Sequence, residues 1–407
     1  MASLRGRTRE RTGSGVVNDL PQLDPDLTLQ RDPVAWLKRG RRYVGPGGAL
    51  VGIVIVFSAL HPFFIHGQNI TNIFTSNSDL MLVAAGMTFA MIGGGFDLSV
   101  GSVMEATGVL LAGLLAVGVP QLLAIIIAVL CAGLFGALVN GFLIGYARLN
   151  FLVVTLGTMT AVQGLVYVVT NGNTLSLSKW HMVAGIGTAK ALGIGIPIWF
   201  MIGAVVIAGV CLRFTRVGRA IYAVGGNREA ARIAGIRVGL ITMLTYGAAA
   251  LFAGMAGIVD AGRLAAASPT VGATINLIAG AAVLLGGTSF SGGEGGIFGT
   301  ILGVLLIGAL ENGLGVIGVS DFWSNVVTGI VLIVAVGLDQ FQKARTRHRF
   351  TRESTEADKA VEPVEQLVAP VGGYEPTVAI VTPPLGQDRP MADGDFARPA
   401  ADRDDIV

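Results

Sequence analysis

The chain is dominated by apolar stretches that are each about as long as a bilayer is thick. A helix needs about 20 consecutive apolar residues to cross the hydrocarbon core of a membrane. Only 13% of the 407 residues are charged, which is about half of the share in a typical soluble domain. We therefore predict an all-α polytopic membrane protein with about ten transmembrane helices. The predicted spans are residues 44–65, 79–95, 98–118, 121–147, 151–170, 196–213, 240–260, 273–287, 296–317 and 322–339.

The number and direction of the spans depend on the short stretches and on the basic residues. The second, third and eighth stretches are short or interrupted by glycine, so the pattern also fits nine or eleven spans. Lysine and arginine accumulate on the cytoplasmic flanks of membrane helices, and here they cluster before the first span and after the last. Both termini are therefore expected in the cytoplasm. The clusters are Lys38, Arg39, Arg41 and Arg42, and Lys343, Arg345, Arg347 and Arg349.

Polar segments precede and follow the spans. Residues 1–43 are basic and lack the apolar core of a signal peptide, so we expect a cytoplasmic N-terminal segment. Residues 341–407 are rich in Pro, Asp, Glu and Arg without sustained periodicity, which is typical of disordered segments. The sequence thus predicts a transmembrane domain over residues 44–340, followed by a disordered cytoplasmic tail.

An internal repeat relates the two halves of the predicted transmembrane domain. Residues 130–157 align without a gap on residues 302–329, so that "GALVNG" matches "GALENG" and Asn140 matches Asn312. Spans 2–5 then match spans 7–10, and a shift of five spans inverts the second copy in the membrane. Inverted repeats are typical of transporters, whose path lies near the repeat interface. A competing match of residues 107–115 with 302–310 implies a parallel repeat but covers fewer residues.

The segment "GGGFDLSVGS" (93–102) puts glycines and a carboxylate between the second and third spans. Two interpretations fit it. The glycines can release the backbone from helical geometry, so that Asp97 or Ser99 caps the next helix. Alternatively, the segment breaks a membrane helix and exposes its polar groups to a translocation path. A second glycine-rich segment, "LGGTSFSGGEGG" (285–296), favours the second interpretation, and the two roles can coexist.

Several polar residues lie inside the predicted spans. Glu105 and Glu311 are membrane-embedded carboxylates, which are functional-site hypotheses by default, although each can also be a hydrogen-bonded structural group. Asn312 follows Glu311 directly. In span 5, hydroxyl and amide groups are available to a passing polar solute, unless the threonines bond back to their own helix. We assign to the path or its gate Glu105, Thr155, Thr158, Gln163, Glu311 and Asn312.

The loop "TRVGRAIYAVGGNREAARIAGIRVGL" (215–240) is long for a connection between spans, strongly basic, and ends in an Ala-rich run "EAARIAGIRV". A short amphipathic helix in a cytoplasmic loop suits contact with a soluble partner. The simpler interpretation is a charged loop that only fixes the orientation of the neighbouring spans.

Four of these segments together resemble one protein family. "GGNREAARIAGI" resembles the coupling loop of ABC importer permeases for ribose, xylose and related monosaccharides, within the branched-chain amino acid/sugar permease superfamily. "GGGFDLSVGS", "TLGTMTAVQGL" and "GGTSFSGGEGGIFGTILGVLLIGALENGL" resemble further segments of that family, in the same order, and the resemblance covers about residues 45–340. It implies a permease subunit, with two copies per complex as a homodimer or pair, that forms the path for a monosaccharide. It also implies a prokaryotic inner membrane, a cytoplasmic ATPase that docks on the coupling loop (214–240), and an extracytoplasmic sugar-binding protein.

The resemblance carries over to individual residues in two segments. In the coupling loop it implies ATPase contacts for Gly226, Asn227, Glu229, Ala230, Ala231 and Gly235. After span 2 it implies a path or gate role for Asp97, Leu98, Ser99 and Gly101. The third glycine and Phe96 depart from the family pattern, which often has an aliphatic residue in place of Phe96.

Energy for transport is expected from a partner, because the chain contains no GxxxxGK[ST] motif: none of its five lysines follows a glycine. We therefore expect no catalytic or metal site and no cofactor in this chain, with ATP and Mg²⁺ on the partner ATPase. An alternative is an ion-coupled secondary transporter of a small polar solute, in which Glu105, Glu311 or Asp97 binds a proton or sodium ion. An intramembrane enzyme would need clustered polar side chains, whereas the four histidines are scattered.

Overall fold

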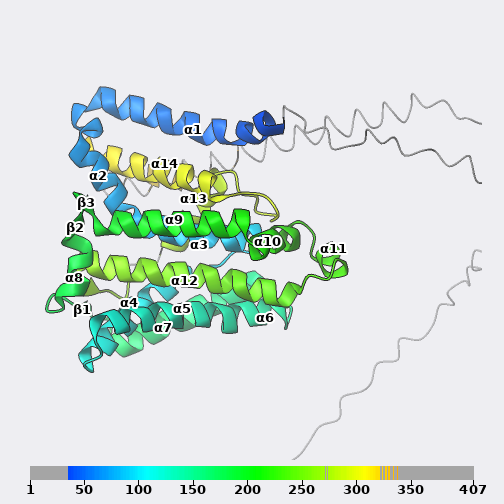
Figure 1. The fold of residues 1–407 in the computed structure, drawn as a ribbon. Coiled ribbons are helices and arrows are strands. Elements are labelled where there is room, and N and C mark those ends of the chain that lie inside the picture. The colour runs from blue at the N-terminus through cyan, green and yellow to red at the C-terminus, as the bar shows by residue number, and fades with distance from the viewer. Residues whose placement is uncertain are drawn as a thin grey trace, which may run out of the picture. The chain divides into compact units, whose positions relative to one another are not determined.

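The computed structural model describes residues 35–320 except 271 and 273, together with isolated positions between 323 and 337. Within this part of the chain, six helical segments are long and apolar enough to cross a membrane. They are Tyr43–Leu60 in α1 (Ala35–Leu60), Gln121–Gly145, α7 (Phe151–Thr170), α9 (Ile196–Phe214), α12 (Val238–Leu264) and α14 (Ile297–Val316). The multi-pass helical architecture predicted from the sequence is thereby confirmed (Figure 1).

Three further apolar helices are shorter than a full membrane crossing. They are α3 (Ser78–Ile92), α4 (Val100–Ala116) and α13 (Ile275–Leu285). These correspond to the second, third and eighth predicted spans, which were the short or glycine-interrupted ones. The tenth predicted span, 322–339, falls where only isolated positions are described, and the predicted tail, 341–407, lies outside the described residues.

The observed bounds correct the first predicted span. Helix α1 begins at Ala35 instead of residue 44, because the basic residues that precede the apolar stretch are themselves good helix formers. Hydropathy locates the part of a helix that crosses lipid, and the hydrogen-bonded helix continues beyond it. The predicted basic segment 1–43 therefore ends inside α1, and its residues 1–34 lie outside the described residues.

Short elements connect the long helices. Only the short helix in the loop 215–240 was expected, because the others are too brief for a periodic pattern. The helical ones are η1 (Pro62–Ile65), α2 (Gly67–Ser76), η2 (Gly136–Gly141), α6 (Phe142–Gly145), α8 (His181–Thr188), α10 (Arg216–Gly226) and α11 (Arg228–Ile233), while α5 (Gln121–Phe135) runs into η2 and α6. Two small antiparallel pairs complete the described part, β1 (Leu175–Ser176) with β4 (Ala266–Ala267) and β2 (Lys190–Ala191) with β3 (Ile194–Gly195).

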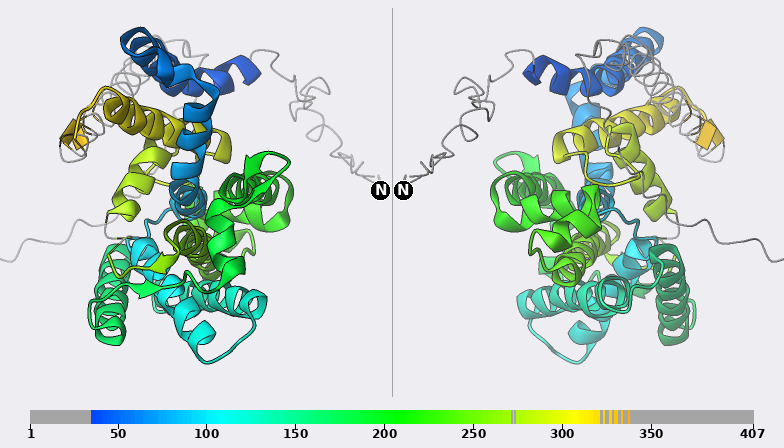
Figure 2. Two further views of the ribbon diagram at one scale, coloured as in Figure 1. Left: turned by 90° about the vertical axis from the view of Figure 1, so that its left-hand side faces the viewer. Right: turned by 90° about the vertical axis from the view of Figure 1, so that its right-hand side faces the viewer.

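The core lies around α3 and α12, which pack against each other. Helix α12 also contacts α4, α5 and η2, and both end views show it among the other helices (Figure 2). All but one of the residues of α3 are buried, as expected for a helix that is apolar on every side. In contrast, α5 and α7 keep rows of exposed Leu, Ile and Val side chains. These two helices therefore present apolar faces suited to lipid or to another membrane protein.

The predicted inverted repeat is visible in the order and direction of the helices. The shift of 172 residues that lays residue 130 on residue 302 also lays α2–α3 on α12, α4 on α13, and α5–α6 on α14. The copies exchange partners, since α12 contacts α4 and α5 whereas α3 contacts α13 and α14. They also run in opposite directions, because α6 ends beside the start of α12, next to α11, whereas α14 begins beside α10. We call this end of the bundle the α11 end and the opposite one the α8 end (Figure 1).

The two copies meet at a pair of equivalent glycines. A Cβ atom on Gly101 would overlap the carbonyl oxygen of Gly272, and a Cβ atom on Gly272 would overlap the carbonyl oxygen of Gly101. A shift of 171 residues, one less than in the alignment of residues 130–157, lays Val100-Gly101 on Val271-Gly272, so the contact joins corresponding glycines of the two copies. If a two-fold axis relates the two copies, it passes where corresponding residues touch each other, so this contact marks its position. Only glycine permits two backbones to approach this closely.

Candidate functional site

A buried polar turn connects α3 with α4. Helix α3 ends at Ile92, and Gly94 continues the chain with a φ of +79°, a conformation that glycine adopts without strain. The Oδ1 atom of Asp97 accepts hydrogen bonds from the Ser99 amide at 2.9 Å and from Ser99 Oγ at 2.6 Å. Asp97 and Ser99 are both fully buried. The glycine-rich segment is therefore a break between two apolar helices with its polar groups turned inward.

The predicted capping role is only partly correct. Ser99 does occupy the N-cap position of α4, but no side chain forms the capping hydrogen bond there. Asp97 instead bonds to the amide two residues on, which is the pattern of an Asx turn. The carboxylate thus shapes the entry into α4 without satisfying the first amides of the helix itself.

Asn140 joins this turn from another helix. Its Nδ2 atom donates to Ser99 Oγ at 2.8 Å and lies 3.5 Å from Asp97 Oδ1. Asn140 lies in η2, a π-helical insertion between α5 and α6, and such insertions are frequent at functional sites. Sequence reasoning identified Asn140 only as a repeat position, because hydrophobic periodicity does not reveal a π turn. Among the described residues, Asp97 Oδ2, Asn140 Oδ1 and Tyr246 Oη are buried without a hydrogen-bond partner, so this region has spare capacity for water or a polar solute.

Phe96, the departure from the family pattern, packs against a glycine. A Cβ atom on Gly280 would overlap the Phe96 ring, and the ring centroid of Phe290 lies 6.1 Å from that of Phe96. The larger side chain therefore occupies space that the missing side chain of Gly280 leaves in α13.

Glu105 and Asn276 tie α4 and α13 together where the repeats meet. Glu105 Oε1 accepts from the Gly272 amide at 2.9 Å, and Asn276 Nδ2 donates to the Leu98 carbonyl at 2.8 Å. Each copy thus extends a side chain to the backbone that precedes the other copy's helix. Glu105 Oε2 has no partner among the described residues. It faces a cavity of about 10 Å³ that Asp260 also lines, which is room for about one water molecule.

Several predicted path residues lie apart from this region. Thr155 Oγ1 is 3.5 Å from the Phe96 carbonyl, so it borders the turn, but Thr158 bonds to Val154 and Thr155 of its own helix. Gln163 is half-buried farther along α7. Glu311 and Asn312 lie toward the α8 end, where Asn312 and Asn69 exchange hydrogen bonds at 2.8 and 3.1 Å. The structure therefore does not gather Thr158, Gln163, Glu311 and Asn312 with Asp97.

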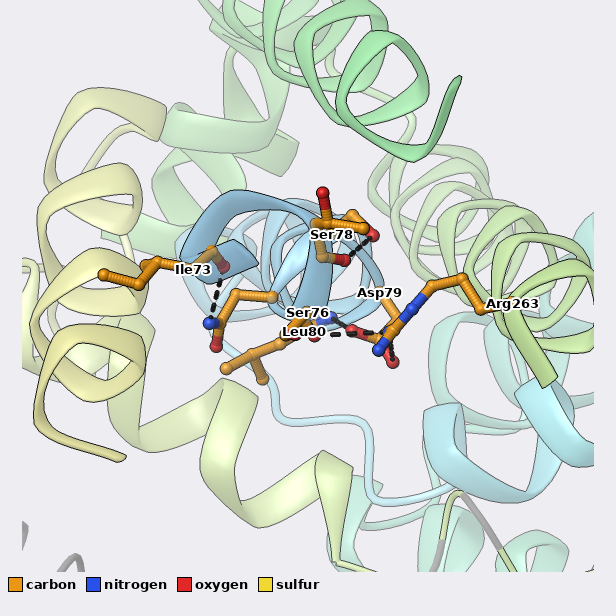
Figure 3. Close-up of polar contacts among 8 residues, drawn as sticks. Ile73, Ser76, Ser78, Asp79, Leu80 and Arg263 are labelled. Carbon is orange, nitrogen blue, oxygen red and sulfur yellow. Dashed lines mark hydrogen bonds and ion pairs between the residues drawn. The ribbon is translucent and has the colours of Figure 1, made fainter. Parts of the chain in front are cut away.

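A charged network at the α8 end was missed by sequence reasoning. Arg263 Nη1 donates to Asp79 Oδ2 at 3.1 Å and to the Ser76 carbonyl at 3.2 Å (Figure 3). Asp79 Oδ1 accepts from the Leu80 amide at 2.9 Å. The network fixes the end of α12 to the junction between α2 and α3. Its residues are far apart in the sequence, so only the folded chain brings them together.

The loop between α9 and α12 folds into the two helices α10 and α11. Thr215 caps α10 by accepting from the Gly218 amide at 3.0 Å, and Asn227 caps α11 by accepting from the Ala230 amide at 2.9 Å. Helix α11 ends at Ile233, because Gly235 takes a φ of +81°. The Ala-rich helical run predicted to continue to Val238 is therefore shorter than expected.

The residues predicted to contact an ATPase divide into two groups. Asn227 and Gly235 shape the loop, and Ala231 is buried against the bundle with 4% exposure. Three others are exposed: Gly226, Glu229 and Ala230. Glu229 bonds Arg232 at 2.6 Å, and this hydrogen bond raises the pKa of Arg232 above its usual range. The structure adds Ile233, whose side chain is 80% exposed.

Backbone glycines connect α10–α11 to both glycine-rich segments, and we call this contact the glycine junction. The Gly293 amide donates to the Ile92 carbonyl at 2.8 Å, and a Cβ atom on Gly225 would overlap that same carbonyl. Tyr222 Oη donates to the Gly295 carbonyl at 3.0 Å. The junction consists of Gly94, Gly225, Gly226, Gly292 and Gly293. Segments 93–102 and 285–296 thus meet each other, and both lie beside the loop.

Among the described residues, no group of three His, Cys, Asp or Glu side chains is arranged to hold a metal ion. The polar groups of the turn and of the α4–α13 contact are hydroxyl, amide and carboxyl groups that bond to one another or to backbone. Buried hydroxyl, amide and carboxyl oxygens of this kind pair with the hydroxyl groups of a polar solute, because each unmade hydrogen bond costs about 1–3 kcal/mol.

Comparison with known proteins identifies the family. A family model described as "Branched-chain amino acid transport system / permease component" matches residues 69–336. The ribose import permease protein RbsC of Bacillus subtilis (strain 168) is 42% identical over 302 residues, which cover 74% of this chain and 94% of the relative.

Two further relatives carry other sugars in their names. The D-allose transport system permease protein AlsC of Escherichia coli (strain K12) is 36% identical, over 75% of this chain and 92% of the relative. The L-arabinose ABC transporter permease protein AraH of Azospirillum brasilense is 34% identical, over 73% and 89%. No solved structure matches the chain. With the family model and these relatives covering most of its length, the chain belongs to this family of ABC transporter permease components.

Proposed function

We propose that the chain is the permease subunit of an ATP-driven importer and forms the translocation path for a monosaccharide of the ribose class. The relatives named above for ribose, allose and arabinose support this substrate class. The proposed complex contains a second permease copy, a cytoplasmic ATPase and an extracytoplasmic binding protein that delivers the sugar. The α11 end then faces the cytoplasm, and residues 44–340 form the transmembrane domain between cytoplasmic termini.

The glycine junction is the observation that carries this proposal. It brings the end of α10, directly before α11, into backbone contact with the end of α3 and with the glycine-rich segment 285–296. A soluble partner that moves α11 therefore also shifts the turn that contains Asp97 and Ser99, to which Asn140 is hydrogen-bonded. An ion-coupled transporter has no need of an exposed helix pair joined to its gating turns, so the ATP-driven function fits the geometry better.

Ile233 is the proposed anchor for the ATPase. Its neighbours Glu229 and Arg232 neutralise each other, which leaves the exposed aliphatic side chain at the tip of α11 as the group that gains most from burial. Complete burial of an isoleucine side chain contributes about 1.5–3 kcal/mol. Residues 227, 231 and 235 then act by holding α11 in shape, instead of touching the partner.

The test replaces Ile233 by Asp and measures copurification of the ATPase from native membranes, together with ribose uptake. We expect copurification to fall at least about tenfold, equivalent to about 1.4 kcal/mol, because the carboxylate must be desolvated at the contact. The matched control is Leu192→Asp, since Leu192 is 90% exposed in the β2–β3 turn at the other end of the bundle. Unchanged copurification and uptake with Ile233→Asp would show that α11 is not the docking element.

A further inference from the structure

A polar cavity lies beside the glycine junction and has no role in the function proposed above. Its volume is about 320 Å³, which reaches the range of about 300–1,000 Å³ typical of small-molecule pockets. Its walls are formed by the turn at Gly93–Gly95, α6 with the connection at Arg148–Phe151, the α10–α11 pair and the first half of α12. A ligand in this cavity would therefore touch both the loop pair and the turn before α4.

The lining of the cavity is cationic. Arg148 and Arg228 both contribute to it, and no carboxylate is among the described residues that line it. Arg228 Nη2 donates to Thr242 Oγ1 at 2.9 Å, so its guanidinium is oriented while other N–H groups remain available. Arg148 has a φ of +55°, a conformation that disfavours ordinary side chains, so the fold holds this residue here against local preference.

A helix terminus adds to the positive potential. Helix α7 begins at Phe151, and Asn150 caps it by accepting from the Leu152 amide at 2.8 Å. Asn150 and Phe151 both line the cavity. The N-terminus of a long helix carries a partial positive charge and unpaired amides, which together with two guanidinium groups match an anion.

Tyr246 supplies an independent indication of a missing ligand. Its side chain lines the cavity and is 2% exposed, and its hydroxyl has no hydrogen-bond partner among the described residues. The hydroxyl lies against Gly95 in the opposing wall, because a Cβ atom there would overlap it. A buried unpaired hydroxyl is costly, and an acceptor in the cavity removes that cost.

We propose that this cavity binds a phosphate ester of net negative charge through Arg148, Arg228 and the N-terminus of α7. Guanidinium groups recognise phosphate by paired hydrogen bonds, and helix N-termini stabilise the charge. A soluble sugar phosphate and an anionic lipid headgroup both present this chemistry. Binding itself is independent of the proposed transport function. The consequence for transport rests on that function: an occupied cavity holds α10–α11 against the turn at Gly93–Gly95 and slows import.

The test measures binding to the full chain in nanodiscs of phosphatidylcholine, a zwitterionic lipid with no net charge. A pentose 5-phosphate is titrated by calorimetry, with the free pentose as the comparison that lacks only the phosphate. We expect the phosphate ester alone to bind, and Arg148→Asn to weaken it at least about tenfold. Asparagine is chosen because it tolerates a positive φ. Arg228→Gln is the second variant, in case the first does not fold.

The control variant is Arg219→Gln, which removes an equal charge from exposed α10 but does not line the cavity. A second arm uses nanodiscs that contain phosphatidylglycerol, with retained lipid measured by mass spectrometry. Lipid retention that requires Arg148, without binding of the sugar phosphate, assigns the same site to a headgroup. Absence of both, or equal binding by Arg148→Asn, Arg228→Gln and Arg219→Gln, would overturn the proposal. Inhibition of uptake by the pentose phosphate, lost in Arg148→Asn, tests the transport consequence separately.

Discussion

At the scale of single residues, Asp97 shows how a carboxylate is kept inside an apolar bundle. One of its oxygens is held by Ser99 and Asn140, and the other has no partner among the described residues. The sequence identified Asp97, Ser99 and Gly101 because glycines and a carboxylate stand out in an apolar stretch. Asn140 and Tyr246 were not predicted as site residues, because neither a π turn nor a tyrosine inside an apolar helix stands out in the sequence.

The acceptor role of Asp97 can be separated from its charge. Asp97→Ala removes the acceptor for the Ser99 amide and hydroxyl, so we expect the free energy of unfolding to fall by about 1–3 kcal/mol. Asp97→Asn keeps an Oδ1 acceptor and should lose less. Both values are measured by denaturant unfolding of the purified protein, and sugar uptake is measured in parallel.

Uptake decides which property of Asp97 the path requires. A folded Asp97→Asn protein with wild-type uptake assigns Asp97 to the shape of the turn. Loss of uptake with retained stability assigns its charge to the path. Equal destabilisation by Asn and Ala would contradict the hydrogen-bonding role.

At the scale of elements, the sequence located helices well and their connections poorly. The predicted span 151–170 coincides with α7, and the glycine-interrupted stretches became the three short helices. The breaks themselves were predicted, because glycine changes backbone freedom locally. That two breaks meet beside Gly225 could not be predicted, since the contact depends on how helices far apart in sequence pack.

The glycine junction provides a matched pair of neighbouring substitutions. A Cβ atom on Gly225 would overlap the Ile92 carbonyl, whereas a Cβ atom on Gly226 has no neighbour within 4 Å. We expect Gly225→Ala to reduce uptake strongly, because a forced shift of backbone in a packed region costs about 1–3 kcal/mol. Gly226→Ala should transport like the wild type. The measurement is initial uptake rate, normalised to the amount of protein in the membrane, and equal rates for the two variants would contradict the junction.

At the scale of the whole transmembrane domain, the inverted repeat places equivalent residues at opposite ends. Asn140 bonds the turn near the α11 end, whereas its counterpart Asn312 bonds Asn69 near the α8 end. Residues that were assigned to one predicted path, such as Asp97 and Asn312, are therefore separated in space. Inversion also explains why no single cluster gathers every polar residue of the described helices.

The sidedness of the two ends can be measured by thiol labelling. After Cys131 and Cys211 are replaced by Ala, single cysteines are introduced as Leu192→Cys and Ile233→Cys, both at exposed positions. We expect an impermeant maleimide to label residue 192 in intact cells and residue 233 only in inverted vesicles, because α9 separates the two. Labelling of both from one side would contradict a membrane-spanning α9, and the reverse result would invert the proposed orientation.

The glycine junction has a genetic consequence. Every missense mutation of a glycine codon introduces a Cβ atom, so at Gly225, Gly292 and Gly293, where the added atom meets backbone, even the smallest change of amino acid is obstructed. A random screen for strains that fail to grow on the transported sugar should therefore accumulate mutations at codons whose products never touch the sugar. Such a map would follow the contact between the two glycine-rich segments and the helices proposed to meet the ATPase, and would distinguish it from the proposed path.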